Sequence, residues 1–238
     1  MWIKICGLTT PDAVTAALDA GADAIGFVFA KSVRQVTPDV ARRLAAAARG
    51  RARCVAVTRH PTQRDIDDIV SIFKPDVLQT DVADLSNLRL PALLELLPVF
   101  RGDGNASNIA SSAANASDAP LTGASTIAGG SAGNTAIGAA SNTASPTLPH
   151  RLLFEGATSG AGIPCDWTAA GAVARRTQLV LAGGLNPTNV AAAIAAVQPF
   201  GVDVSTGVEV RPGVKSPVEI ANFVRAARES RVAYEDLV

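Results

Sequence analysis

Eight short apolar segments, spread along a chain of 238 residues, constrain the fold more than any other feature. Each is a near-continuous apolar run rather than an alternating one, which is the pattern of parallel strands covered on both faces. Parallel strands need crossover connections, and alanine-rich amphipathic segments separate most of the runs at intervals of roughly 20 to 30 residues. The predicted strands span 2–6, 24–29, 54–58, 76–80, 96–100, 151–155, 179–183 and 202–206.

Eight such strands favour a closed (β/α)8 TIM barrel over an open doubly wound sheet. No G-x-G-x-x-G motif of a dinucleotide-binding fold follows the first run. The chain length suits one barrel, so we interpret residues 1–238 as a single domain. Capping residues and periodicity predict helices that begin at Thr10–Asp12 and end at Gly21, that begin at Pro38 with Thr37 as N-cap, and that span 62–73, 86–95, 168–176, 187–197 and 217–229.

One long segment interrupts this pattern. Residues 102–148 are almost entirely Ala, Ser, Gly, Asn and Thr, with very little charge and no aromatic side chain. Such a composition buries too little apolar surface to order itself, so we expect a disordered, low-complexity insertion. It falls where the fifth helix of the barrel should lie, and we expect that helix to be lost or interrupted.

Charge and cysteine content exclude several classes of protein. The chain has 21 Lys and Arg against 21 Asp and Glu, which offers no basic field for nucleic acid. We expect no signal peptide and no membrane-spanning helix, because no apolar run has the required length. Three widely spaced cysteines, Cys6, Cys54 and Cys165, argue against a disulfide framework and against a zinc site, and a cytoplasmic location fits best.

Catalytic groups of a barrel lie at the carboxyl ends of its strands. The first strand ends at Lys4-Ile5-Cys6, and alternation places Lys4 and Cys6 together in the barrel interior. Cys6 is a candidate base or nucleophile if its thiolate is stabilised, although most isolated cysteines are small buried hydrophobes. Arg34, in the loop after the second strand, could bind a carboxylate or a phosphate, or could be an ordinary surface arginine. Glu155 closes the sixth strand and is a candidate general acid, the alternative being an exposed strand-end carboxylate.

The last two strands end in loops that suit a phosphate group. Glycines let backbone N–H groups approach an anion, and the loops after the seventh and eighth strands are the usual phosphate site of this fold. Asp203 would be repelled by phosphate and is expected to bind a sugar hydroxyl of the substrate instead. The predicted phosphate-binding residues are Gly183, Gly184, Ser205, Thr206 and Gly207.

The predicted site therefore combines a thiol, a carboxyl group, an arginine and a pair of phosphate-binding loops at one end of the barrel. The sequence shows no metal-ligand cluster and no Ser/His/Asp set, and His60 and His150 are expected in loops. An acid and a base facing a phosphorylated small molecule indicate proton transfer, and therefore an isomerisation.

Several motifs, in this order and spacing, resemble the phosphoribosylanthranilate isomerase family. They are KICGLT at 4–9, GADAIGFVF with SVRQV at 21–36, SGAGIPCDW at 159–167, LAGGLNPTNV at 181–190 and GVDVSTGVEVRPGVK at 201–215. The resemblance implies an aldose–ketose isomerase of tryptophan biosynthesis, acting as a monomer or homodimer and without a cofactor. It implies that Cys6 is the general base, supported by Lys4, and that Arg34 holds the anthranilate carboxylate.

The chain departs from the family pattern at three places. The general acid of the family is commonly an aspartate in an LLLD pattern, whereas this chain has Leu152-Leu153-Phe154-Glu155, so Glu155 takes that role. The family's QLHG pattern is here Leu78-Gln79-Thr80-Asp81, without the histidine. The third departure is the insertion.

Two alternatives are considered. Related barrel enzymes, the histidine-pathway sugar isomerase and indole-glycerol-phosphate synthase, are expected to carry an aspartate at the position of Cys6 or a lysine and glutamate arrangement that is absent from this sequence. A catalytically inactive barrel that binds a phosphorylated ligand is the alternative from another class, and the departures at Glu155 and Thr80 are its support.

Overall fold

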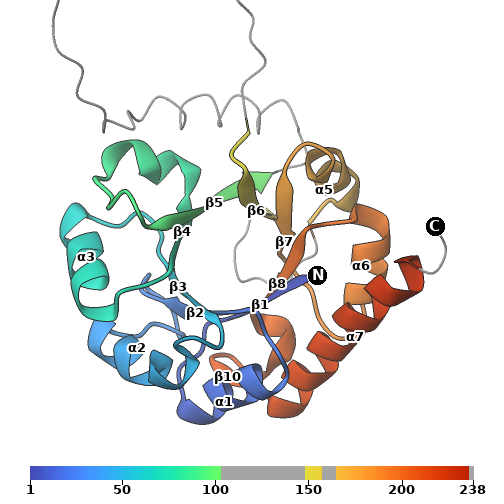
Figure 1. Ribbon diagram of the computed structural model, residues 1–238, viewed down its shortest axis with the longest axis horizontal. Coiled ribbons are helices and arrows are strands. Elements are labelled where there is room, and N and C mark those ends of the chain that lie inside the picture. Colours follow the sequence, from blue (N-terminus) through green and yellow to red (C-terminus); the bar gives the residue numbers. More distant parts are fainter. Residues whose placement is uncertain (103–147, 157–164, 236–238) are drawn as a thin grey trace, which may run out of the picture.

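The computed structural model describes residues 1–102, 148–156 and 165–235. Within them, parallel strands pair in the order β1 to β8, and β8 returns to β1, which closes the barrel of Figure 1. The predicted (β/α)8 TIM barrel is therefore confirmed. Its strands are β1 (Trp2–Cys6), β2 (Ala24–Val28), β3 (Arg53–Val57), β4 (Val77–Asp81), β5 (Glu95–Gly102), β6 (Arg151–Gly156), β7 (Gln178–Leu181) and β8 (Gly201–Val204).

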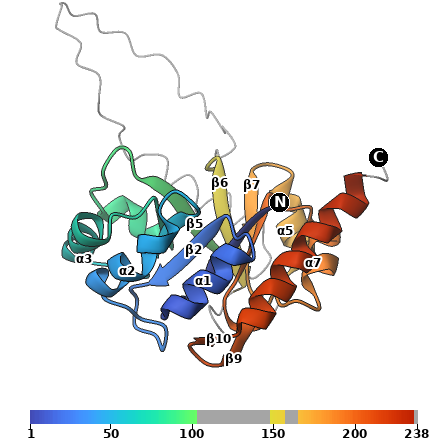
Figure 2. The ribbon, with the colours of Figure 1, turned by 60° about the horizontal axis from the view of Figure 1, so that its bottom comes forward.

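Helices surround the barrel, as Figures 1 and 2 show. The C-terminal helix α7 packs against both α6 and α1, so the outer layer of helices closes between the last and the first parts of the chain. Short helical turns extend several of these connections: η1 (Ala45–Ala48), the π-helical η2 (Ile69–Phe73), and the 3-10 turns η3 (Val82–Asn87) and η4 (Thr206–Val208). The α-helices are α1 (Pro11–Asp19), α2 (Pro38–Leu44), α3 (Gln63–Asp68), α5 (Trp167–Ala174), α6 (Val190–Val197) and α7 (Pro217–Glu235). A small hairpin, β9 (Glu209–Arg211) with β10 (Val214–Lys215), follows β8.

Alternation along the strands divides the core in two. Outward side chains such as Ile5, Phe27 and Phe154 are fully buried between the barrel and its helices. Inward side chains form a separate cluster that includes Val55 and Leu153. The barrel is thus a filled core covered on both faces, which explains why its strands appear in the sequence as uninterrupted apolar runs.

Most helix predictions hold to within a few residues. The Thr10 and Thr37 side chains cap α1 and α2 by accepting bonds from Ala13 and Val40 N–H groups, both at 3.3 Å. The helix predicted over 86–95 is wrong: the 3-10 turn η3 occupies the start of this segment, an extended loop follows, and β5 begins at Glu95. Pro91 explains the difference, because it lacks an N–H donor and disfavours helical backbone at the residue before it.

Strands β7 and β8 end earlier than predicted. Gly183 has a φ of 91°, which turns the chain away from β7, and Ser205 leaves the extended conformation directly after β8. Ser205 and Thr206 therefore lie in a loop at the barrel mouth rather than in a strand. The predicted insertion and the question of a fifth helix lie outside the described residues, as do residues 159–164 of the SGAGIPCDW motif.

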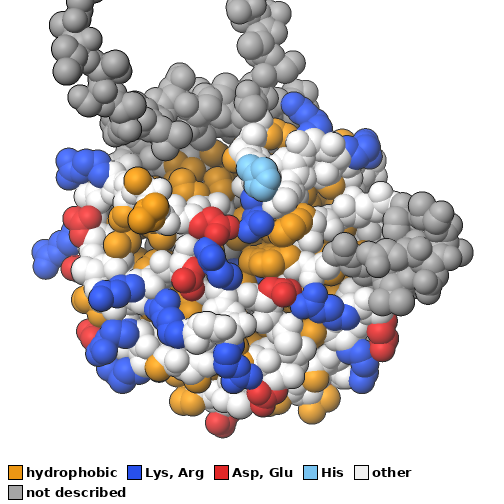
Figure 3. All heavy atoms as spheres, viewed as in Figure 1, with side chains coloured by type: hydrophobic (Ala, Val, Ile, Leu, Met, Phe, Trp, Pro, Cys, Tyr) orange, Lys and Arg blue, Asp and Glu red, His pale blue; other side chains and the backbone are white. Residues whose placement is uncertain are grey.

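The described helices include none that is both long and apolar enough to cross a membrane. On the face seen in Figure 3, basic and acidic side chains alternate over the surface rather than gathering by sign. This mixed distribution agrees with the balanced charge of the sequence.

Candidate active site

A cavity of about 230 Å³ opens at the carboxyl ends of the barrel strands. Cys6 from β1 and Glu155 from β6 both line it, so the predicted base and acid face one shared space. Strand β8 and the loops after β2, β7 and β8 contribute the other predicted groups that reach this cavity. They are Arg34, Gly183, Gly184, Asp203, Ser205 and Thr206.

Lys4 and Cys6 lie side by side in the barrel interior, as alternation along β1 predicted. Lys4 is completely buried, and its Nζ donates to Asp203 Oδ1 of the neighbouring strand β8 at 3.0 Å. Gly26 of β2 makes room for both side chains: a Cβ there would lie 3.0 Å from Lys4 Cε and 3.1 Å from Cys6 Sγ. A side chain at Gly26 would therefore displace the groups that surround the thiol.

Burial and charge act in opposite directions on this pair. Burial lowers the pKa of Lys4, but Asp203 and Cys6 more than offset it, so the pKa of Lys4 is raised. Burial raises the pKa of the Cys6 thiol, and Lys4 and Lys215 oppose that shift without cancelling it. These shifts favour a neutral thiol beside a charged lysine.

Arg34 is held by an acidic partner that the sequence interpretation did not include. Its Nε and Nη2 donate to the two carboxylate oxygens of Glu209, both at 2.7 Å, and Lys215 Nζ reaches Glu209 Oε1 at 2.7 Å. Burial tends to raise the pKa of Glu209, but the bonds from Arg34 and Lys215 dominate and lower it to about 2. Burial lowers the pKa of Lys215, with Glu209 opposing. This network fixes the Arg34 guanidinium at the edge of the cavity and leaves Nη1 outside the bidentate pair.

The two loops predicted to hold phosphate lie next to each other. Lys215 Nζ donates to the Ser205 carbonyl at 2.8 Å and to its hydroxyl at 3.2 Å, which ties the β8 loop to the charged network. Gly207 is not among the residues that line the cavity. A Cβ at Gly207 would lie 1.9 Å from the Leu185 carbonyl oxygen, so this glycine permits close contact between the β7 and β8 loops.

Glu155 is partly buried, with 12% of its side chain exposed, and forms an ion pair with Arg101 Nη1. Arg101, from the end of β5, also contacts Asp81 Oδ1 through Nε at 2.9 Å and Nη2 at 2.7 Å. The guanidinium therefore bridges two carboxylates on the strands that flank β5. An arginine in this place orients Glu155 and favours its charged form.

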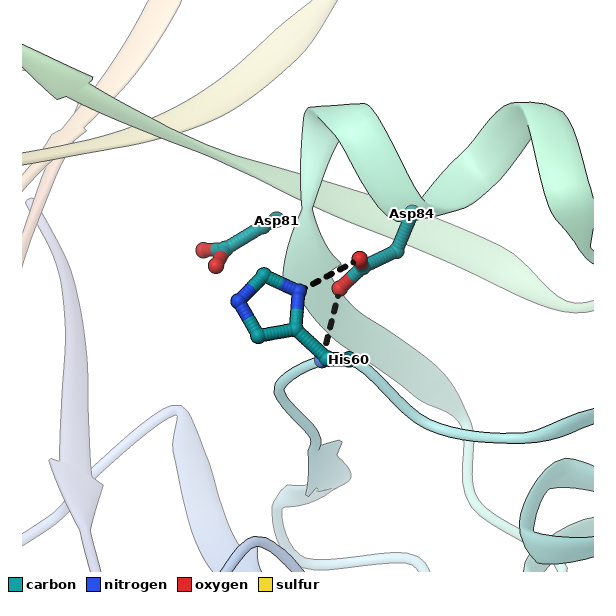
Figure 4. Close-up of side chains that lie close together, drawn as sticks. All are labelled: His60, Asp81 and Asp84. Carbon is teal, nitrogen blue, oxygen red and sulfur yellow. Dashed lines mark hydrogen bonds and ion pairs between the residues drawn. The ribbon is translucent and has the colours of Figure 1, made fainter.

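His60, Asp81 and Asp84 are the group among the described residues whose ligand atoms could surround a metal ion, all within 4.8 Å of one another. Figure 4 shows the His60 ring bonded to Asp84, at 2.9 Å, with the Asp81 carboxylate on its other side. Asp81 is already paired with Arg101, and Arg59 Nε lies 3.8 Å away. These arginines compete with any bound cation, so the trio fits an ion-pair cluster better than a metal site.

Sequence reasoning missed Arg101, Glu209, Lys215 and the Thr80 contact. The strand prediction ended at Phe100, one residue before Arg101, and therefore did not place an arginine at the barrel mouth. Glu209 and Lys215 belong to the motif at 201–215, but nothing in the linear sequence pairs them with Arg34. Thr80, in the stretch that departs from the family's QLHG pattern, is fully buried and donates to Asp84 Oδ2 at 3.0 Å.

Comparison with known proteins identifies the family. The sequence profile of N-(5'phosphoribosyl)anthranilate (PRA) isomerase matches residues 3–119 and 136–226. A relative from Rhizobium rhizogenes, N-(5'-phosphoribosyl)anthranilate isomerase, is 36% identical over 238 residues, covering 96% of this chain and 94% of the relative. The chain belongs to this family.

Two solved structures of phosphoribosylanthranilate isomerases share the fold across 96% of this chain and 99% of theirs. One, in complex with reduced 1-(o-carboxyphenylamino)-1-deoxyribulose 5-phosphate, has a TM-score of 0.67 at 25% identity. The other, a set of monomers generated from the dimeric enzyme of Thermotoga maritima, has a TM-score of 0.68 at 26% identity. An isomerase function in tryptophan biosynthesis follows from the family membership.

Proposed function

We propose that this chain catalyses the Amadori rearrangement of N-(5-phosphoribosyl)anthranilate to 1-(2-carboxyphenylamino)-1-deoxyribulose 5-phosphate, with Cys6 as general base and Glu155 as general acid. The observation that carries the assignment of roles is that both side chains line one cavity bordered by the two glycine loops. A proton donor and a proton acceptor on opposite sides of a sugar-sized space are what an aldose–ketose conversion needs.

In the proposed rearrangement Glu155 and Cys6 each carry out one proton transfer, and a tautomerisation follows. Glu155 donates a proton to the furanose ring oxygen, the C1–O bond breaks, and the nitrogen lone pair forms a Schiff base at C1. The Cys6 thiolate then removes the proton from C2, and the electrons of that C–H bond neutralise the Schiff base to give an enolamine. In the final tautomerisation the C2 hydroxyl group loses its proton, the C2–O bond becomes the carbonyl, and the electrons of the C1–C2 double bond take up a proton at C1 to give the ketone.

The charges around Cys6 support its role as a base. Lys4, Lys215 and Arg34 are positive, while their partners Asp203 and Glu209 are negative. The charges of Lys4 and Lys215 lower the pKa of the Cys6 thiol, and the charge of Asp203 raises it. The charge of a Cys6 thiolate in turn raises the pKa of Arg34. These five groups sum to one positive charge, which a Cys6 thiolate would balance. The net positive charge offsets part of the effect of burial, which still leaves the pKa of the Cys6 thiol raised.

Glu155 must carry a proton to act as an acid, and its ion pair with Arg101 opposes protonation. Binding of a substrate that brings its own carboxylate and phosphate places further negative charge at the cavity, which favours protonation of Glu155. Asp81 then retains Arg101 as its partner. In this proposal Arg101 holds the Glu155 carboxyl group in place before the substrate arrives.

The remaining contacts follow from charge. Arg34 binds the anthranilate carboxylate, and Asp203 accepts a bond from a sugar hydroxyl while it orients Lys4. The phosphate is surrounded by Gly183, Gly184, Ser205 and Thr206, and Gly207 lets the loops that carry them lie close together. No group beyond these side chains is required for the proton transfers. We further propose that the enzyme is cytoplasmic. We also propose that it acts as a monomer or homodimer, and light scattering after size-exclusion chromatography would decide between these two oligomeric states.

The test of the assigned roles uses substitutions with a matched cysteine control. Cys6→Ala and Glu155→Gln are expected to lower kcat by roughly 10²- to 10⁴-fold, the usual contribution of a general base or acid, while the fold is retained. Cys54 is also buried but lies outside the cavity, so Cys54→Ala is expected to keep wild-type kcat. Turnover is followed by loss of phosphoribosylanthranilate fluorescence and by rescue of a tryptophan-requiring host.

Two results would overturn the proposal. Wild-type kcat in Cys6→Ala would remove the thiol from the mechanism. Ligand binding by the wild-type chain without turnover would instead identify a catalytically inactive barrel.

A further inference from the structure

Gln79 occupies an interior position of β4 where its neighbours are apolar. In the strand register it pairs with Val57 of β3 and Leu97 of β5, one step above Val77 on the same face of β4. Val77 and Leu97 belong to the interior cluster of the barrel, with Val57 packed against it. Only 7% of Gln79 is exposed, so its side chain is buried beside these apolar residues.

The amide oxygen of Gln79 lacks a hydrogen-bond partner in the described part of the chain. The backbone of the residue is satisfied, because its carbonyl accepts from the Thr58 N–H at 2.8 Å. A buried acceptor without a donor destabilises a folded protein, and an apolar residue of similar size would avoid that cost. Such a group calls for a physical explanation, and a ligand that donates to it is one.

Gln79 also lines the cavity that contains Cys6 and Glu155. A carbonyl oxygen is repelled by phosphate or carboxylate oxygens, which leaves the hydroxyl groups and the secondary amine of the proposed substrate as donors. We propose that Gln79 is a substrate-binding residue whose side-chain oxygen accepts a hydrogen bond from a hydroxyl or N–H group of the bound phosphorylated sugar amine. This inference rests on the proposed function for the identity of the ligand.

If Gln79 binds substrate, replacing it should lower activity without lowering the stability of the fold. A purely structural role predicts that stability and activity fall together. Gln79→Met keeps the length of the side chain and removes the unpaired acceptor. The variant is expected to melt at the same temperature as the wild type or higher, while kcat/KM falls roughly 10- to 100-fold. Affinity for reduced 1-(o-carboxyphenylamino)-1-deoxyribulose 5-phosphate is expected to fall by a similar factor, and affinity for inorganic phosphate to stay unchanged.

A second barrel glutamine provides the matched control. Gln178, at the start of β7, accepts bonds from Arg151 at 2.9 and 3.1 Å and is not among the residues that line the cavity. Gln178→Met is therefore expected to show the opposite pattern, with a lower melting temperature and wild-type kcat/KM. The two variants make the same chemical change at opposite ends of the barrel.

Four outcomes are decisive. A Gln79→Met enzyme with kcat/KM within twofold of wild type overturns the contact, as does a large drop in its melting temperature that accounts for the lost activity. If the wild-type chain shows no turnover, the proposed function fails, and analogue affinity then judges Gln79 alone: equal affinity in wild type and Gln79→Met overturns the inference. If the wild type binds no analogue either, both proposals fall.

Discussion

Replacing Gly26 with alanine tests the packing of the proposed catalytic thiol. The new Cβ would lie 3.0 Å from Lys4 Cε and 3.1 Å from both Lys4 Nζ and Cys6 Sγ. Attractive contacts between such atoms occur at about 3.5–4.0 Å, so the two side chains must retreat by about 0.5 Å or more. Lys4 is fully buried and is bonded to Asp203, which leaves it no free space for that movement.

The expected loss of activity follows from this displacement. A misplacement of about 1 Å can cost about 10²-fold in rate, so a shift of about half that size should lower kcat/KM roughly 10-fold. Overpacking costs about 1–3 kcal/mol, partly offset by the roughly 0.5–1 kcal/mol that alanine gains over glycine in a strand. The free energy of unfolding should therefore fall by about 2 kcal/mol or less.

Gly50→Ala serves as the control for stability. Gly50 has a φ of 79° and no atom within 4 Å of an added Cβ, so alanine there meets backbone strain of about 1–2 kcal/mol without a steric clash. Denaturant unfolding and the fluorescence assay would be run on both variants. Similar stability with reduced kcat/KM only in Gly26→Ala supports the reasoning, whereas a folded Gly26→Ala enzyme with wild-type kcat/KM refutes it.

Three further predictions concern the charged groups of the cavity. Glu209→Gln should lower stability at pH 7 by about 1–3 kcal/mol, because the carboxylate has a folded pKa of about 2 against an ordinary 4.5. A lowered pKa stabilises the fold above pH 4.5 and loses that effect towards pH 2, so denaturation curves of variant and wild type should converge on acidification. Arg101→Met should reduce kcat more than it raises KM, since it leaves the orientation of Glu155 undefined; an unchanged kcat would contradict that role. Burial raises the pKa of Cys6 above the ordinary 9.0, so kcat/KM should still be rising with pH at pH 9, and a flat profile from pH 7 to 10 would exclude the thiolate as base.

The sequence by itself determined the architecture. Eight apolar runs, their spacing and the capping threonines at Thr10 and Thr37 are local features, and local features suffice because each strand and helix is specified by its own periodicity. The segment around Pro91 was the exception, since a helical pattern of leucines there is overridden by the backbone restrictions of proline. The strand-end residues Cys6 and Glu155 were placed at one mouth because all parallel strands of a barrel end on the same side.

Only the tertiary structure decided which charges meet. Arg34 pairs with Glu209, 175 residues away along the chain, and Arg101 bridges Asp81 and Glu155 on neighbouring strands. Such pairings depend on strand register and on loop paths, which no local periodicity encodes. The sequence also cannot show that the amide oxygen of Gln79 lacks a hydrogen-bond partner, because whether a polar atom has a partner depends on everything packed around it.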